Sequence, residues 1–544
     1  MPSVSPLRVP GRVQVLIAGG GPVGLAAAVE LGRRGIDVLV VEPRATVSHA
    51  RPRCKTLNVR TMEHLRRWGL AERLRARAPL PPSWSQDVVF CTSLSGRELS
   101  RFTGVLGLVP EGDRFPETGQ QAPQYVLEEV LREAVEEIAP GRLVLGSKVV
   151  GVRQNAELVT VTVEDGTGRR SVVAADYVIG CDGPRSVVRD EIGARYVGGE
   201  ALRPNFGMVF ESPGLWEHVA HGPAVQYWVV NAAAPALVGP LDRTDTWWAI
   251  GFGVDRETGE REAQQIIDGV AGRPVRAKVL STDPWTARMM TVDRMRDGRV
   301  FLAGDAAHLN PPFGGHGLNT GIGDAVDLGW KLAAVLDGWG GPGVLASYES
   351  ERRPVQERVI REATANMRVL STELYADDLD ADDEAGARAR RAAGVRIQES
   401  KKAEFHSLGL VLGLRIAESP IVPVAHSVWA GARLPHLFLA DGRSLYDLLG
   451  AGLTLLALAE DAPVAAVEEA ARLRGVPLTV VRLPEPVAAG YAANLGARLV
   501  LVRPDQVVAW LGDEAAEDAV ALIDTVGGGA PRPVHTFPER KQHV

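Results

Sequence analysis

Cysteine is scarce in this chain of 544 residues and occurs only as Cys54, Cys91 and Cys181. The three positions lie far apart and form neither a CxxC pair nor the spacing of a zinc site. A disulfide framework and a structural zinc centre are therefore excluded as organising features of the fold. This cysteine usage is typical of a reducing compartment, and we expect a cytoplasmic protein.

Long hydrophobic runs are also missing. The apolar segment Val13–Val29 is crowded with glycine and is followed by Glu30, which predicts a strand, a turn and a helix rather than a signal peptide or a membrane span. The 60 Lys and Arg residues are mixed with 67 Asp and Glu residues, which gives a net charge of −7. We expect neither a nucleic-acid surface nor a membrane partner. The length allows more than one domain.

Glycine, in contrast, is concentrated in the stretch Gly304–Ala333. The apolar run Val300–Ala303 predicts a short buried strand, Pro311-Pro312 breaks the chain, and a helix is expected from about Asn319. A glycine-rich approach to a helix N-terminus presents backbone N–H groups to an anionic or polarised group. Asp305, at the strand end, could hold a hydroxyl-bearing ligand. We interpret the stretch as a ligand site; a packing turn is the alternative.

A second glycine-rich turn, Gly19-Gly20-Gly21-Pro22-Val23-Gly24, follows the predicted strand Val13–Ala18. Gly19, Gly21 and Gly24 provide a tight turn, backbone access for a pyrophosphate and close helix packing. Glu42 lies 18 residues beyond Gly24, where an acidic side chain meets a pair of ribose hydroxyls. The pattern predicts a site for an ADP-containing dinucleotide, and it does not distinguish FAD from NAD.

Cations and aromatic residues supply further candidates. Arg53 and Arg60 flank the start of a helix predicted near Thr61–Trp68 and are candidates for anion contact. From Asn205 to about Leu280 the pattern is mostly strands, and its aromatic residues are Phe206, Phe210, Tyr227, Trp228, Trp247 and Trp248. A sheet that turns such rings toward a cavity can bind a flat apolar substrate, although any single ring is more simply a core residue.

The remainder of the chain predicts further helices and a separate small unit. A helix is expected after Pro354, and the acidic-to-basic segment Ala376–Arg391 is interpreted as a mobile surface loop. A boundary is expected between Pro420 and Gly431. Beyond about Arg433, strands and helices alternate in an α/β unit that contains no cysteine and so cannot perform dithiol chemistry.

Three motifs, in this order, resemble those of the class A flavoprotein aromatic hydroxylases, which have the para-hydroxybenzoate hydroxylase fold: GGGPVG with Glu42, VIGCDGPRSVVRD, and GDAAHLNPPFGGHGLNTGIGDA. The tail motifs GARLPHLFLADGRSLYDLLG and LVLVRPDQVVAW resemble the branch of phenol hydroxylases, chlorophenol monooxygenases and polyketide-tailoring hydroxylases. The resemblance covers nearly the whole chain.

The fold class implied by this resemblance is α/β. A Rossmann-like FAD-binding domain would comprise residues 1–85, 104–200 and 285–370, and a β-sheet substrate domain residues 86–103 and 201–284. A helical and loop linker would follow over 371–430, and a thioredoxin-like α/β domain over 431–544.

The resemblance also implies roles for individual residues. Gly19, Gly21, Gly24 and Glu42 would hold the ADP half of FAD. Arg53 and Gln124 would approach the ribityl and pyrophosphate region, Asp305 a ribityl hydroxyl, and Asp182 belongs to a second fingerprint associated with FAD and NADPH. Gly317, Leu318 and Asn319 would lie at the flavin pyrimidine edge, where a helix N-terminus stabilises the negative charge of reduced flavin. Pro311 and Pro312 would wall the side on which oxygen adds.

Lys55 and His316 depart from the family pattern. Phenol hydroxylases have an aspartate where this chain has Lys55, which cannot be the same base but could stabilise a phenolate. His316 stands where many relatives have glutamine or another residue, and our hypothesis is that it tunes the flavin turn or contacts the substrate. The expected substrate contacts are Lys55, Tyr227, Trp228, Trp248 and Phe313.

The implied activity is that of an FAD-dependent monooxygenase with NADPH as transient reductant, NADH being the alternative. Dioxygen would form a C4a-hydroperoxide, whose distal oxygen passes to a phenolic or hydroxypyridine ring in secondary metabolism or aromatic degradation. A Baeyer–Villiger or epoxidising monooxygenase acting on a polyketide-like substrate is the alternative. A halogenase is disfavoured because its WxWxIP signature is missing, and a flavin-loaded binding protein without turnover belongs to a different class. The expected partners are a small aromatic substrate and O2, and a homo-oligomer is an open alternative.

Overall fold

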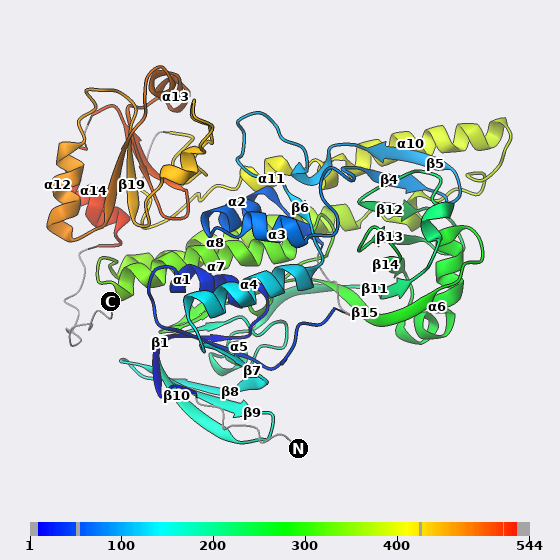
Figure 1. The fold of residues 1–544 in the computed structure, drawn as a ribbon, viewed down its shortest axis with the longest axis horizontal. Coiled ribbons are helices and arrows are strands. Elements are labelled where there is room, and N and C mark those ends of the chain that lie inside the picture. Colours follow the sequence, from blue (N-terminus) through cyan, green and yellow to red (C-terminus); the bar gives the residue numbers. More distant parts are fainter. Residues whose placement is uncertain (1–8, 50–54, 424–426, 515, 530–544) are drawn as a thin grey trace. The chain divides into compact units, whose positions relative to one another are not determined.

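The computed structural model describes residues 9–49, 55–423, 427–514 and 516–529. The chain divides into two compact units, which we describe separately (Figure 1). The first unit contains residues 1–33, 37–326 and 353–414, and the second contains residues 34–36, 327–352 and 415–544. Arg53, an expected site residue, and Cys54 lie outside the described residues.

A parallel sheet forms the centre of the first unit. Its order is β16-β17-β10-β1-β2-β7, with parallel pairing from β17 to β7. The strands are β16 (Arg296–Asp297), β17 (Val300–Leu302), β10 (Arg170–Gly180), β1 (Arg12–Ala18), β2 (Val38–Glu42) and β7 (Leu143–Leu145). The antiparallel strands β8 (Ser147–Gln154) and β9 (Val159–Asp165) extend from β10. Continuous apolar runs form β1 and β2, as is usual for parallel strands covered on both faces.

Helices and two short strands accompany this sheet. They include α1 (Pro22–Gly32), α2 (Val59–Arg67), α3 (Ala71–Arg77), α4 (Gln124–Ile138) and α5 (Val187–Glu191), and the two-residue strands β3 (Thr56–Leu57) and β6 (Gln120–Gln121) pair with each other. Helix α1 begins with Pro22, directly after Gly21. Proline suits the first helical position, because the N–H that it lacks would have no acceptor within the helix. The long helices α7 (His316–Leu336) and α8 (Pro342–Met367) contribute residues to both units.

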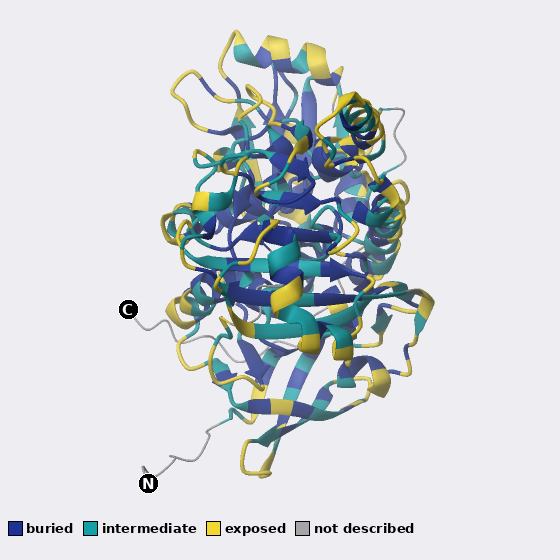
Figure 2. Ribbon diagram, turned by 90° about the vertical axis from the view of Figure 1, so that its right-hand side faces the viewer, coloured by how far each residue is buried: buried dark blue, intermediate teal, exposed yellow. Residues whose placement is uncertain are grey.

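A second, mixed sheet contains the predicted aromatic strands. Its order is β18-β15-β11-β14-β13-β12-β4-β5. The strands are β18 (His308–Leu309), β15 (Lys278–Val292), β11 (Tyr196–Glu211), β14 (Thr246–Phe252), β13 (Ala236–Pro240), β12 (Gln226–Val229), β4 (Val88–Cys91) and β5 (Glu98–Phe102). Side chains alternate between its faces, so that Tyr227 and Trp228 lie in different hydrophobic clusters. Figure 2 shows dark-blue and teal residues along the strands, whereas much of the yellow, exposed surface belongs to helices and loops.

The expected strands between 205 and 280 are present as β11 to β15, and helix α6 (Arg256–Ala271), which was not expected, lies among them. The Asp255 side chain accepts the N–H of Thr258 and caps its start, and Gly272 ends it in the left-handed conformation. Ile266, Ile267 and Val270 pack on the sheet face that also buries Tyr227 and Trp247. These capping signals were present in the sequence, and the aromatic strands around them obscured the helical period.

Two further expectations about helices were wrong. The segment predicted as a mobile loop is partly helical, because α10 (Glu384–Phe405) begins at Glu384 after the capping residue Asp383. Helix α8 begins at Pro342 and continues through Pro354 instead of starting after it. Helix α10 packs against β5, and together with α9 (Ser371–Leu374) and α11 (Leu408–Leu412) it belongs to the first unit.

The second unit contains the predicted C-terminal α/β structure. Its four-stranded sheet has the order β20-β19-β21-β22, formed by β20 (Leu478–Arg482), β19 (Leu453–Ala457), β21 (Leu499–Val502) and β22 (Val508–Gly512). The pair β19–β20 is parallel and the others are antiparallel. Three helices accompany it: α12 (Ala465–Arg474), α13 (Val487–Leu495), which sequence reasoning did not identify, and α14 (Ala519–Val526).

Candidate active site

The glycine turn after β1 is shaped by close backbone contacts. Gly19 has a φ of +100°, and a Cβ there would lie 2.4 Å from the carbonyl oxygen of Cys181. A Cβ at Gly24 would lie 2.0 Å from the Gly19 carbonyl oxygen, so α1 can approach β1 only without a side chain. A Cβ at Gly21, in contrast, would meet no atom within 4 Å. The turn therefore has an open side at Gly21, where the N-terminus of α1 faces outward.

Glu42 ends β2 beside this turn. Its Oε2 accepts the N–H of Gly20 at 2.7 Å, and its Oε1 accepts the backbone N–H and the Nε of Arg44. Arg44 also forms an ion pair with Glu128, whose Oε1 accepts a hydrogen bond from the Gln124 side chain. The structure thus brings the predicted residues Glu42 and Gln124 into one polar cluster with Arg44 and Glu128.

Arg132 belongs to the same cluster and was missed by sequence reasoning. It follows Gln124 and Glu128 at helical spacing on α4, and this spacing was the available signal. Its Nε and one terminal nitrogen are buried without a hydrogen-bond partner among the described residues. Burial lowers its pKa, and Glu42 and Glu128 oppose that effect. These donors can therefore bind a polar or anionic group beside the glycine turn.

Asp182 follows β10, close to the glycine turn. Its Oδ2 accepts the N–H of Val188, and its Oδ1 is buried without a partner among the described residues. Burial is the largest cause of its raised pKa, and hydrogen bonds from Ser186 and Val188 oppose it. Its unpaired oxygen is a second acceptor that a polar ligand can satisfy.

Asp305 is exposed in a short 3-10 turn, η3 (Gly304–Ala306), at the end of β17. Asp324 on α7 fixes this turn from inside: its carboxylate accepts the N–H of Gly304 at 3.1 Å and is bonded to His308 Nε2 at 3.0 Å. Asp324 and His308 are both buried. Asp324 was not among the predicted residues, although it lies in the same motif, because its role depends on a contact 20 residues away in the chain.

The start of α7 is anchored by the side chain of Asn319. Its Oδ1 accepts the N–H of Asn58 and the hydroxyl of Thr61, and its Nδ2 donates to the carbonyl oxygens of Thr56 and Gly315. Gly317 and Leu318 lie in the first turn of the helix, where backbone N–H groups have no intrahelical acceptor. Asn319 therefore fixes the first turn of α7, and with it these N–H groups, relative to β3 and Gly315.

His316, the first residue of α7, is 4% exposed, and its Nε2 has no hydrogen-bond partner among the described residues. Burial lowers its pKa to about 4. The imidazole is consequently neutral near pH 7 and cannot act there as a cationic group.

Four of the five expected substrate contacts lie on one face of the mixed sheet. Trp228 stacks on Phe90 with ring centroids 5.3 Å apart, and Phe313, from the proline turn, lies 6.2 Å from the Trp228 ring. Trp248 packs against the same cluster. Tyr227 lies on the opposite face, near Trp247, and donates its hydroxyl hydrogen to the Gly222 carbonyl. Strand alternation separates Tyr227 from Trp228, and we leave Tyr227 out of the proposed substrate surface.

Lys55 joins this aromatic face to the β3 strand. Its Nζ donates to the backbone carbonyls of Val225 and Pro240 and lies 5.2 Å from the Trp248 ring centroid. The side chain is buried, and burial lowers its pKa to about 7. The next residue, Thr56, is bonded to Asn319, so Lys55 lies between the sheet face and the start of α7.

Comparison with known proteins places this geometry in a family. Residues 12–363 match the FAD binding domain family, and residues 427–528 match the aromatic-ring hydroxylase C-terminal family. Tetracenomycin B2 monooxygenase-dioxygenase of Streptomyces olivaceus is 34% identical over 95% of this chain and 98% of its own length. The 2,4-dichlorophenol 6-monooxygenase of Delftia acidovorans is 31% identical, covering 92% of this chain and 94% of its own. The structure of the rebeccamycin biosynthetic enzyme RebC with reduced flavin has a TM-score of 0.87 at 34% identity, covering 96% of this chain and 100% of RebC.

The chain therefore belongs to the FAD-binding aromatic-ring hydroxylase family, the class A flavoprotein hydroxylases. It is an FAD-dependent monooxygenase, and the family resemblance read from its motifs is confirmed. Within the described parts of the chain, no helix combines the length and the apolar character needed to cross a bilayer.

Proposed function

We propose that the enzyme uses NADPH and O2 to hydroxylate a phenolic or hydroxypyridine ring held against the Trp228 face of the mixed sheet. The observation that carries the proposal is the juxtaposition of Trp228, Phe313, Trp248 and Lys55 with the anchored start of α7. Relatives that act on tetracenomycin B2 and on 2,4-dichlorophenol support an aromatic substrate.

The residues around the glycine turn fit FAD. The open side at Gly21 leaves room for a pyrophosphate, and the unpaired atoms of Arg132 and Asp182 supply a donor and an acceptor for polar groups. In the proposal, Gly19, Gly21, Gly24, Glu42 and Gln124 hold the ADP half, joined by Arg132. Asp182 and Asp305 accept hydrogen bonds from hydroxyl groups of the ribityl linker of the cofactor. Arg53 remains an expected contact from the sequence alone.

The start of α7 orients the redox end of the cofactor. Bound FAD supplies hydride acceptance and oxygen activation. Gly317, Leu318 and Asn319 direct backbone N–H groups at the pyrimidine edge, where they favour the negative charge of the reduced state. Pro311 and Pro312 wall one side of the ring system, and neutral His316 lines the same turn. The buried rings of Trp228 and Phe313 exclude water from the substrate side.

Lys55 orients the oxygen substituent of the substrate. The Lys55 ammonium group donates to two backbone carbonyl oxygens and lies beside Trp248, and its positive charge favours an electron-rich oxygen nearby. Cys91 and Cys181 are free thiols in the described structure, which supports the cytoplasmic location that we retain in the proposal. The proposal includes a homo-oligomer as one of the possible states of the enzyme.

The test is anaerobic flavin reduction by NADPH with a panel of phenols and hydroxypyridines, followed by turnover under ¹⁸O2. A ring substrate should accelerate reduction at least tenfold and yield a product with one labelled oxygen on an aromatic carbon. A labelled ester or epoxide would identify the Baeyer–Villiger or epoxidising alternative. Purified protein that fails to bind FAD would refute both.

A further inference from the structure

Helix α10 carries a buried ion pair that none of the motifs includes. Lys401 Nζ donates to Glu404 Oε2 at 2.8 Å, and it also donates to the Asn366 carbonyl oxygen at 2.8 Å. The two side chains are 0% and 2% exposed. Both partners lie within the first unit, on a segment that the sequence predicted as linker.

The cation of this pair lies against the aromatic face. Lys401 Nζ is 4.3 Å from the Trp228 ring centroid and 5.9 Å from the Phe313 ring centroid. A desolvated ammonium over an aromatic ring is attracted by the ring quadrupole more strongly than an exposed one, which fixes the relative position of cation and ring. Lys401 thus contacts the two rings proposed to wall the substrate.

The anion of the pair lies beside the turn Pro311–Gly315. The Gly314 backbone N–H lowers the pKa of the Glu404 carboxyl group, while burial, the larger effect, raises it. Gly314 and Gly315 have φ angles of +83° and +68°, so this turn consists of two consecutive left-handed residues without side chains of their own. Asn319 on α7 donates to the Gly315 carbonyl oxygen, and the ring of Phe313, in the same turn, has its centroid 5.9 Å from Lys401 Nζ on α10.

Stability alone does not account for such a pair. Buried ion pairs are often no more stabilising than well-packed apolar residues of similar volume, because removing two charges from water is costly. What an apolar pair cannot reproduce is a cation that donates to the Asn366 carbonyl oxygen and also lies over two aromatic rings. The pair connects the turn beside the expected flavin edge with the expected substrate wall.

We propose that Lys401 and Glu404 are positioning residues, which fix the turn Pro311–Gly315 relative to the Trp228–Phe313 wall and so set the distance between cofactor and substrate ring. The inference rests on the proposed function for the identity of the two walls. Neither residue is assigned contact with the reacting atoms.

The central test is the double substitution Lys401→Met with Glu404→Leu, compared with Lys402→Met, which replaces an exposed lysine one position away. The holoenzymes are measured for unfolding temperature, FAD content, midpoint potential of bound FAD, and product formed per NADPH consumed. We expect the double variant to fold and to bind FAD as the wild type does. Its relative affinity for reduced and oxidised FAD should change at least tenfold, equivalent to about 30 mV for a two-electron couple.

Coupling provides the second readout. Product per NADPH should fall at least fivefold in the double variant, with hydrogen peroxide formed instead, while Lys402→Met stays at the wild-type value. Glu404→Gln retains a side-chain oxygen that can accept from Lys401 Nζ and should recover most of the coupling. Unchanged potential and coupling in a folded double variant would overturn the inference.

Two outcomes separate this inference from the proposed function. The potential does not depend on finding a substrate, so a shifted potential supports positioning even if no phenol is hydroxylated. If the double variant does not fold, the midpoint potential of Glu404→Asp is the deciding measurement. This variant keeps the negative charge but has a side chain that is one methylene shorter. A shift of potential in that variant supports positioning, and a wild-type potential contradicts it.

Discussion

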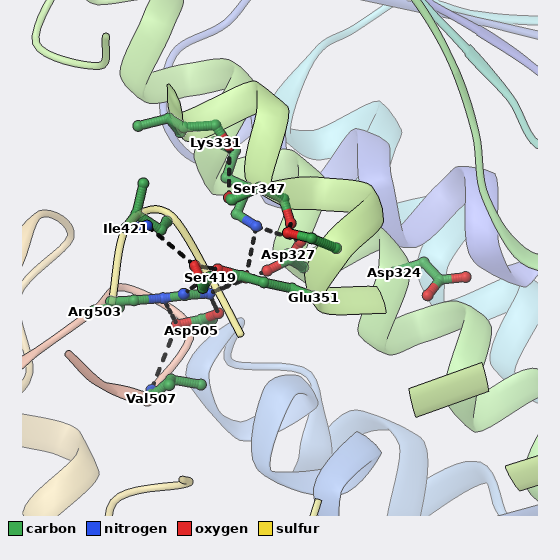
Figure 3. A network of polar contacts seen from close by, with 12 residues as sticks. Asp324, Asp327, Lys331, Ser347, Glu351, Ser419, Ile421, Arg503, Asp505 and Val507 are labelled. Atoms are coloured by element: carbon green, nitrogen blue, oxygen red, sulfur yellow. Dashed lines mark hydrogen bonds and ion pairs between the residues drawn. The ribbon is translucent and has the colours of Figure 1, made fainter. Parts of the chain in front are cut away.

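Arg503 and Glu351 form a bidentate ion pair, although they are 152 positions apart in the chain. The two nitrogen–oxygen distances are 2.8 and 2.9 Å, and neither side chain is exposed. Arg503 follows β21 and Glu351 lies on α8, both in the second unit. Figure 3 shows the surrounding contacts, in which Asp327, Lys331 and Asp505 complete a network of three carboxylates and two cations.

Removal of Arg503 should destabilise the second unit strongly. Arg503→Met leaves buried carboxylates without their cation, and breaking a buried pair costs about 3–5 kcal/mol. Urea unfolding monitored by fluorescence gives the free energy of unfolding. Arg472→Met is the matched control, because Arg472 pairs with Glu469 at an exposed position and should cost at most about 1 kcal/mol. Equal losses in the two variants would contradict a special role for the network.

Asp327 should make stability depend on pH between about 4 and 7. Burial raises its pKa from 3.8 to about 7, although Lys331 and Arg503 oppose the rise. A carboxyl group that binds its proton more tightly in the folded state loses stability as the pH rises through this window, with a slope of at most about 1.4 kcal/mol per pH unit. Glu351 acts in the opposite sense, because Arg503 and Lys331 hold its pKa well below the ordinary value despite its burial.

The check for Asp327 is a comparison with Asp327→Asn. The variant has no titrating group at that position, so the difference in unfolding free energy, wild type minus variant, should decrease from pH 5 to pH 7.5. Stability profiles that run parallel over this range would show that Asp327 does not titrate there.

Substitutions at Gly21 and Gly24 should separate cofactor binding from folding. Gly24→Ala places a Cβ 2.0 Å from the Gly19 carbonyl oxygen and should prevent normal folding. Gly21→Ala meets no protein atom within 4 Å, so the apoprotein should keep its unfolding temperature. Its methyl group enters the space expected for the pyrophosphate and should weaken FAD binding at least tenfold, measured by fluorescence titration. Equal FAD affinity in Gly21→Ala and wild type would place the pyrophosphate elsewhere.

Lys55→Met should stabilise the protein most at low pH. Burial lowers the pKa of Lys55 to about 7 from 10.5, so the folded state binds fewer protons than the unfolded state between these values. Wild-type stability therefore rises with pH across that window and is lowest below pH 7. The variant lacks this dependence, and its advantage at pH 6.5 should shrink as the pH approaches 10.

The same variant tests the substrate contact. KM for the ring substrate should increase several-fold, whereas FAD affinity stays unchanged, because Lys55 is proposed to contact only the substrate. Lys402→Met, at an exposed position, should alter neither stability nor KM. A wild-type KM in Lys55→Met would remove Lys55 from the substrate site.

Local patterns predicted the dinucleotide-binding part of the fold well. The strand, glycine turn and helix around Gly19–Gly24 depend on neighbours within the same segment, and the structure contains them as β1, the turn and α1. Helix α6 was missed although Asp255 and Gly272 mark its ends, because the aromatic strands on both sides dominated the pattern. The predicted loop at Ala376–Arg391 failed for a similar reason: charge composition outweighed the capping residue Asp383.

The sequence by itself determined the family, the cofactor and the order of the domains' motifs, because glycine turns and helix starts are specified by residues close together in the chain. Only the tertiary structure decided which sheet face buries Trp228 rather than Tyr227, and which charges are brought together away from water. The alternation of side chains along β12 places Tyr227 and Trp228 on opposite faces, but it does not predict which of the two faces α6 covers. Contacts such as Lys401 with Phe313 and Arg503 with Glu351 join distant segments, and no local period encodes them.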